Sequence, residues 1–139
     1  MAVAPLPQVA QVIRYAVSVI PSEKILMGIP NYGYDWTLPY ERSRPARVIS
    51  NAGAVRLASQ KGAEILYDVR AQAPYFFYYD DNGYQHVVWF EDARSIQAKL
   101  GLVEEYHLGG VSYWNISQYF AQNCLVLNSM FGVRKMFEV

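Results

Sequence analysis

Apolar positions along the chain follow two patterns, a spacing of three to four residues and short continuous runs. The first pattern predicts amphipathic helices that pack one face on a core. The second is typical of strands covered on both faces, as in a parallel sheet. The predicted helices are residues 9–20, 50–61, 91–106 and 120–130, and the predicted buried strands are residues 25–29 and 111–114.

Residues at the ends of these segments support the bounds. Pro21 ends the first helix, and Ser50 and Gly62 are suited to cap the start and the end of the second. Glu91 and Asp92 open the third helix, where acidic side chains are stabilised by the positive end of the helix dipole. Adjacent helical positions do not face each other, so we expect this pair to cap the helix rather than to act as paired catalytic carboxylates.

The middle of the chain follows a different pattern. An irregular segment rich in proline and arginine is followed by the helix at 50–61 and then by strand-like runs, two of which flank "DDNG". Asn82 and Gly83 predict a hairpin turn with positive φ at both positions. An antiparallel α+β piece is therefore expected inside an α/β chain. Its loop is residues 38–47, and its strands are residues 64–67, 74–79 and 84–90.

The amino-acid composition narrows the classes of partner that the chain could bind. Hydrophobic residues make up 53% of the 139 residues, which is enough for a core, and the formal net charge of zero leaves no basic stripe for nucleic acid. No apolar run approaches the ~20 residues that span a bilayer. The single cysteine excludes an internal disulfide, and His86 and His107 are isolated. We expect no metal, no cofactor, no nucleic acid and no membrane partner.

Aromatic residues make up 15% of the chain, and 12 of them are tyrosines. The helix–strand units predict a (β/α) barrel or an open parallel sheet, in which sites lie at the carboxyl ends of the strands. Aromatic rings with polar tips suit a sugar-binding cleft. The candidate substrate-binding residues are those that follow the two buried strands: Tyr32, Tyr34, Asp35, Trp36 and Trp114.

Four of the five candidates also have a structural alternative. Trp114 either stacks under a pyranose or is a core tryptophan, and Tyr32 either points its hydroxyl at a sugar or is a hydrogen-bonded structural residue. Asp35 either contacts sugar hydroxyls or bonds its own backbone in a turn. Trp36 either lines the cleft or packs against the middle segment. The run 75–79 fits strand packing better than a sugar platform.

Two parallel strands raise a problem of closure. A barrel needs about eight strands, and strands that are apolar on both sides would expose edges and faces to water. We therefore expect the chain to be part of a larger domain, in which the remainder of a barrel or a second copy covers the strands.

Three motifs occur in order: "GIPNYG" after the first buried strand, the α+β insertion, and "GGVSYW" at the second strand. Together they resemble the C-terminal part of family-18 glycoside hydrolases, in the branch of N-acetylglucosaminidases that acts on spore cortex and peptidoglycan. The resemblance implies the C-terminal portion of a TIM (β/α)8 barrel, with an inserted α+β subdomain at 38–92 between the segments 7–37 and 93–139. It makes residues 24–30 the seventh strand and residues 111–114 the eighth.

The resemblance also implies residue roles. Trp114 matches the tryptophan on the floor of the subsite for the reacting sugar, and Tyr32 matches the tyrosine that ends the seventh strand. Tyr34, Asp35 and Trp36 would line the cleft. The polymer implied is an N-acetylglucosamine-containing polysaccharide, in the cell wall, in the spore or outside the cell.

Two parts of the family pattern are missing, the acidic motif of the fourth strand and the tyrosine of the sixth. The acidic motif D-x-x-D-x-D-x-E does not occur among the 12 acidic residues. The family hydrolyses glycans by a substrate-assisted route in which that glutamate protonates the leaving oxygen. We therefore expect the chain alone to be inactive and hydrolysis to belong to a parent enzyme. The alternative is a non-catalytic carbohydrate-binding or cell-wall assembly module of the same fold.

Overall fold

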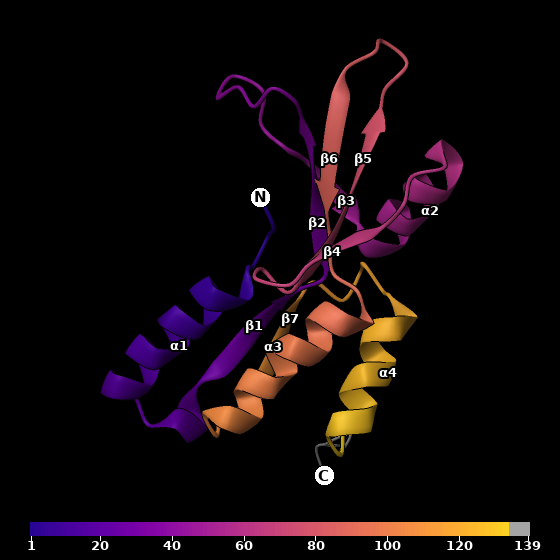
Figure 1. The fold of residues 1–139 in the computed structure, drawn as a ribbon. Coiled ribbons are helices and arrows are strands. Elements are labelled where there is room, and N and C mark those ends of the chain that lie inside the picture. Colours follow the sequence, from indigo (N-terminus) through magenta and orange to yellow (C-terminus); the bar gives the residue numbers. More distant parts are fainter. Residues whose placement is uncertain (134–139) are drawn as a thin grey trace.

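The computed structural model describes residues 1–133 and has two parts (Figure 1). The lower part contains a two-stranded parallel sheet and the helices packed on it. Its elements are α1 (Leu6–Val19), β1 (Leu26–Pro30), α3 (Ala93–Glu105), β7 (Gly110–Trp114) and α4 (Ala121–Met130), with a 3-10 turn at Ser22–Lys24. The mixed α/β class is confirmed, and two parallel strands alone do not close a barrel.

The upper part contains a five-stranded antiparallel sheet in the order β3-β2-β6-β5-β4, with one helix beside it (Figure 1). Its elements are β2 (Tyr32–Thr37), β3 (Arg47–Ser50), α2 (Asn51–Lys61), β4 (Leu66–Asp68), β5 (Ala73–Tyr79) and β6 (Gln85–Trp89). Because β2 pairs with both β3 and β6, the antiparallel sheet begins at Tyr32 and not at Leu38.

The predicted helices are confirmed, and so are three of the predicted caps. The Ser50 hydroxyl accepts a hydrogen bond from the Gly53 N–H at 3.0 Å, and Gly62 ends α2 in the left-handed region with φ 62°. Asp92 caps α3 in a capping box with Ser95. The capping role predicted for Glu91 is wrong, because its carboxylate is buried and accepts a hydrogen bond from Lys99 Nζ at 2.8 Å.

The β5–β6 hairpin is confirmed, but its turn is not the predicted one. Gly83 has φ 82°, whereas Asn82 does not have a positive φ. The Asp80 carboxylate accepts hydrogen bonds from the N–H groups of Asn82 and Tyr84, at 2.9 Å and 2.8 Å, and so organises a wider loop. The side chain of Asp80 therefore determined a turn type that the Asn-Gly pair alone did not.

Each part has its own core. In the lower part, α1, α3 and α4 cover one side of the parallel pair around buried residues that include Ile13, Ile29, Ile96 and Leu100. In the upper part, α2 covers one face of the sheet around residues that include Ala54, Ala58, Phe76 and Phe90. No helix among residues 1–133 is long and apolar enough to cross a membrane.

The parallel pair leaves one face exposed, as the closure problem led us to expect for two strands without further cover. Leu26 in β1 is 61% exposed and Trp114 in β7 is 72% exposed, while Met27 and Ile29 are buried. Side chains alternate across a strand, and in the described chain only one face of this pair has helices packed on it. The other face carries the candidate site.

Candidate functional site

The carboxyl ends of β1 and β7 lie side by side and bring two of the candidates together. The parallel register places Pro30 opposite Trp114, and Tyr32 follows Pro30 after one residue. Tyr32 and Trp114 both line a pocket of about 260 Å³, together with Val3, Ala4, Gly28, Ile29 and Pro30. The exposure of Trp114 is 72%, so it is not a core tryptophan in this structure. We call this pocket the rim pocket.

A row of aromatic rings leads away from the rim pocket along β2. Tyr32, Tyr34 and Trp36 are at alternate positions and therefore share one face of the strand. Their ring centroids are 5.6 Å and 5.8 Å apart, and Tyr40 follows Trp36 at 5.6 Å, each pair edge-to-face. We call these four residues the aromatic row. It offers a continuous aromatic surface that starts at the rim pocket.

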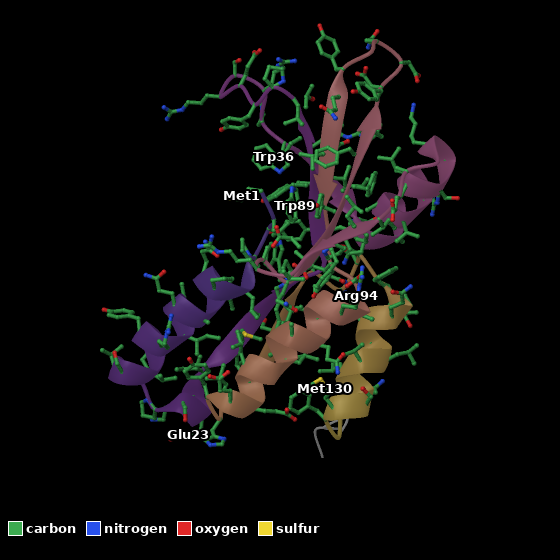
Figure 2. The ribbon with its side chains drawn as sticks, viewed as in Figure 1. Met1, Glu23, Trp36, Trp89, Arg94 and Met130 are labelled. Carbon is green, nitrogen blue, oxygen red and sulfur yellow. The ribbon has the colours of Figure 1, made fainter. Side chains whose placement is uncertain are left out.

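Trp36 combines the two roles that the sequence left open. It lines a second pocket of about 430 Å³ with Met1, Leu38, Tyr40 and Val87. Its indole N–H also donates to the backbone oxygen of Met1 at 3.2 Å, and Figure 2 shows the two residues beside each other. Trp36 is therefore both a packed residue and a lining residue.

Asp35 does not join the aromatic row. It lies on the opposite face of β2 and is 3% exposed. Its carboxylate accepts hydrogen bonds from Arg47 at 2.9 Å and from the Tyr78 hydroxyl at 2.8 Å, and His86 Nδ1 lies 2.8 Å from its other oxygen. The period of two that aligns its aromatic neighbours turns Asp35 away from them. The structure thus gives Asp35 and His86 structural partners rather than a place at the rim.

Tyr78 is tied to the same carboxylate. Burial raises the pKa of the Tyr78 hydroxyl well above its usual value, and the hydrogen bond to Asp35 raises it further. Burial also raises the pKa of Tyr32 at the rim pocket. Both phenols are therefore protonated at neutral pH, and the Tyr32 hydroxyl can donate a hydrogen bond to a sugar.

The run 75–79 divides between two faces of β5. Phe76 and Tyr78 pack against α2, which confirms strand packing for two of the five residues. Tyr75 and Phe77 lie on the other face, where Tyr75 stacks on Trp89 with centroids 4.6 Å apart and an interplanar angle of 22°. This face is shared with the aromatic row, because Tyr34 pairs with Trp89 in register. The sequence analysis missed Trp89, although the alternation in β6 could have indicated it.

Buried polar residues next to the rim were also missed. Asn31, Asn51 and Asn123 are 6%, 0% and 1% exposed and are joined by side-chain hydrogen bonds. Glu91 and Lys99 form an ion pair with both side chains 1% exposed. Burial raises the pKa of Glu91, and the Lys99 charge opposes this rise. The sequence offers little signal for these clusters, since their members are far apart along the chain.

The rim pocket has aromatic and apolar lining residues but no carboxylate. Within residues 1–133, no group of three or more His, Cys, Asp or Glu side chains is placed to hold a metal ion. The arrangement can therefore bind and orient a ligand with apolar faces and hydroxyl groups. None of its lining residues is a carboxylic acid that could protonate a leaving oxygen.

Comparisons with known proteins agree on one family. The model of glycosyl hydrolases family 18 matches residues 3–118. The cortical fragment-lytic enzyme of Bacillus subtilis (strain 168) is 50% identical over 135 residues, which cover 96% of this chain and 31% of that protein. The crystal structure of the spore cortex-lytic enzyme SleL of Bacillus cereus aligns with a TM-score of 0.93 at 48% identity, over 97% of this chain and 31% of that one.

The SleL structure of Bacillus megaterium QM B1551 aligns with a TM-score of 0.94 at 48% identity, over 99% of this chain and 32% of that one. This chain therefore spans about a third of the length of the curated relatives it matches.

Proposed function

The chain belongs to glycosyl hydrolase family 18, and from this premise we propose that it forms one side of the sugar-binding cleft of an enzyme that hydrolyses N-acetylglucosamine-containing glycans. The polymer would be spore-cortex peptidoglycan or a related chitin-like chain, at the spore or cell wall. The observation that carries the proposal is the rim pocket, where Tyr32 and Trp114 meet at the carboxyl ends of neighbouring parallel strands.

We also propose that β1 and β7 are the seventh and eighth strands of a (β/α)8 barrel and that the antiparallel part is an insertion between them. The exposed face of β1 and β7 supports this placement, as does the alignment with about a third of SleL. The remainder of the barrel, or a second copy of the chain, would cover the strand edges that have no partner within residues 1–133.

The rim residues have distinct roles in this proposal. The Trp114 indole stacks on the apolar face of a pyranose, and the protonated Tyr32 hydroxyl bonds its polar edge. Tyr34 and Trp36 continue the surface for further sugars along the aromatic row. Asp35 has no such role, because its carboxylate is held on the other face of β2.

Hydrolysis by the substrate-assisted route needs a carboxylic acid at the leaving oxygen. No carboxylate lines the rim pocket, so this acid has to come from another segment of a longer enzyme. The same observation favours the second candidate, a carbohydrate-binding or cell-wall assembly module that holds glycan without cleaving it.

A titration with N-acetylglucosamine oligomers tests the proposal. We expect Trp114→Ala to weaken binding about tenfold or more, which corresponds to about 1.4 kcal/mol. Tyr15→Ala is a matched control, because Tyr15 on α1 is also 72% exposed. Glucose oligomers, which lack the acetamido group, test the ligand class. Equal binding by wild type and Trp114→Ala would contradict the proposal. Release of shorter oligomers by the chain would contradict the claim that the catalytic acid comes from another segment.

A further inference from the structure

We propose that Asn31 is the positioning residue for the Trp114 side of the rim pocket and links it to the antiparallel part of the molecule. The inference rests on the sugar-binding role proposed for that pocket. Asn31 lies between β1 and β2, is 6% exposed and is bonded on both sides of its carboxamide.

The donors of Asn31 all hold the segment that begins at Trp114. Its backbone N–H donates to the Trp114 oxygen at 2.8 Å. Its side-chain nitrogen donates to the backbone oxygens of Asn115 at 3.2 Å and Gln118 at 2.6 Å. One residue therefore satisfies three carbonyl groups in residues 114–118.

The acceptor of Asn31 faces the opposite way. Its side-chain oxygen lies 3.4 Å from Asn51 Nδ2, at the start of α2, and 3.3 Å from Asn123 Nδ2, in α4. Asn51 in turn accepts the backbone N–H of Glu91 at 2.9 Å. The fully buried Asn51 thus connects Asn31 to the upper part of the molecule, and Asn123 connects it to the helix layer below.

The segment 115–118 has little else to hold its conformation. Ile116 is 85% exposed and Tyr119, just beyond the segment, is 69% exposed, so neither anchors it in a core. The remaining bonds are local, such as Ser117 N–H to Asn115 Oδ1 at 3.1 Å. A buried polar group that loses its hydrogen-bond partner lowers the stability of the folded state. Because the other hydrogen bonds of this segment are local, those from Asn31 are the main contacts that fix the direction of the chain after Trp114.

Asparagine suits this position because a carboxamide offers two N–H donors and an acceptor at once. An aspartate of the same shape keeps the acceptor for Asn51 and Asn123 and loses both donors to the loop. Asn31→Asp therefore separates the proposed positioning function from the general packing of the residue.

Two readouts test the proposal in the 139-residue chain labelled with 5-fluorotryptophan. We expect Asn31→Asp to weaken binding of N-acetylglucosamine oligomers about tenfold and to shift or broaden the ¹⁹F resonance of Trp114, which a Trp114→Phe variant assigns. The Trp89 resonance should not change. A merely structural role would lower the melting temperature of the variant and leave the Trp114 resonance in place.

Asn82→Asp makes the same chemical change at an exposed position in the β5–β6 hairpin and should change neither readout. Asn31→Ser keeps one donor and should show a smaller change in both, so the test does not depend on Asn31→Asp folding. Unchanged binding and an unchanged Trp114 resonance in these Asn31 variants would overturn the inference. Failure of the wild type to bind would overturn the proposed function, while the resonance would still report on Asn31.

Discussion

The two sheets of this molecule bury their side chains in different ways. The antiparallel sheet packs one face on α2 and leaves an aromatic face open, with residues such as Tyr75 and Trp89 on it. The parallel pair packs one face on its helices and leaves a face that includes Leu26 and Trp114. Both open faces meet at Tyr32, where the chain passes from β1 into β2.

The difference shows which part can hold itself together. The antiparallel part has four strand pairings and a helix on one face, which is a complete α+β layer. The parallel part has a single strand pairing within the described residues, and parallel sheets are stable when both faces are covered. The antiparallel part should therefore be the more independent of the two.

The largest expected effect comes from the buried ion pair of Glu91 and Lys99, at the point where the chain passes from β6 to α3. Lys99→Met leaves the Glu91 carboxylate buried without its cation, which should lower the free energy of unfolding by about 3–5 kcal/mol. Urea unfolding monitored by circular dichroism measures the loss. The double variant Glu91→Leu/Lys99→Met should recover most of it, because an apolar pair replaces the buried charges.

The pH dependence of Lys99→Met has a definite sign. Burial raises the folded-state pKa of Glu91, so the folded state binds the proton more tightly than the unfolded state. Stability should then fall as pH rises above the usual range of a glutamate, and the loss should be smaller at pH 5 than at pH 8. A loss independent of pH would show that the charge is not its cause.

Substitutions at two neighbouring residues of β5 distinguish the packed face of the antiparallel sheet from its open face. Phe76 is 0% exposed and Phe77 is 43% exposed. Phe76→Ala should lower the free energy of unfolding by about 3–5 kcal/mol, since it empties the core under α2. Phe77→Ala should cost below about 0.5 kcal/mol, as surface changes do. Hydrogen exchange should place the Phe76→Ala loss in the antiparallel part, and similar losses for the two variants would contradict the assignment of faces.

The last prediction sharpens the comparison within the antiparallel part. Tyr78→Phe removes the hydrogen bond to the Asp35 carboxylate and should cost about 1.5–3 kcal/mol at neutral pH. The folded-state pKa of Tyr78 is raised, so this stability is present below about pH 10 and is lost as pH rises further.

Urea unfolding of both proteins from pH 8 to pH 11 measures the difference for Tyr78→Phe. The gap between them should narrow above pH 10, and the other tyrosines cancel because both proteins contain them. A constant gap would contradict the raised pKa.

Local signals in the sequence were sufficient to predict most of the helices and strands. Helical spacing and end residues such as Pro21, Ser50 and Gly62 predicted the helices, because caps and periodicity act within a few residues. The turn after Asp80 was predicted less well, since a side-chain acceptor competed with the Asn-Gly preference. The strand β3 was missed between the predicted loop at 38–47 and the predicted helix start at Ser50, because its pairing with β2 is not a local property.

The sequence by itself determined most of the elements, the family motifs and the placing of aromatic residues at the ends of two buried strands. Only the tertiary structure decided which of these side chains share a surface. It joined Tyr32 to Trp114, turned Asp35 to the other face of β2 and buried Asn31 between segments far apart in the chain. The physical reason is that strand register and side-chain alternation, which depend on partners distant in sequence, set the direction of each side chain.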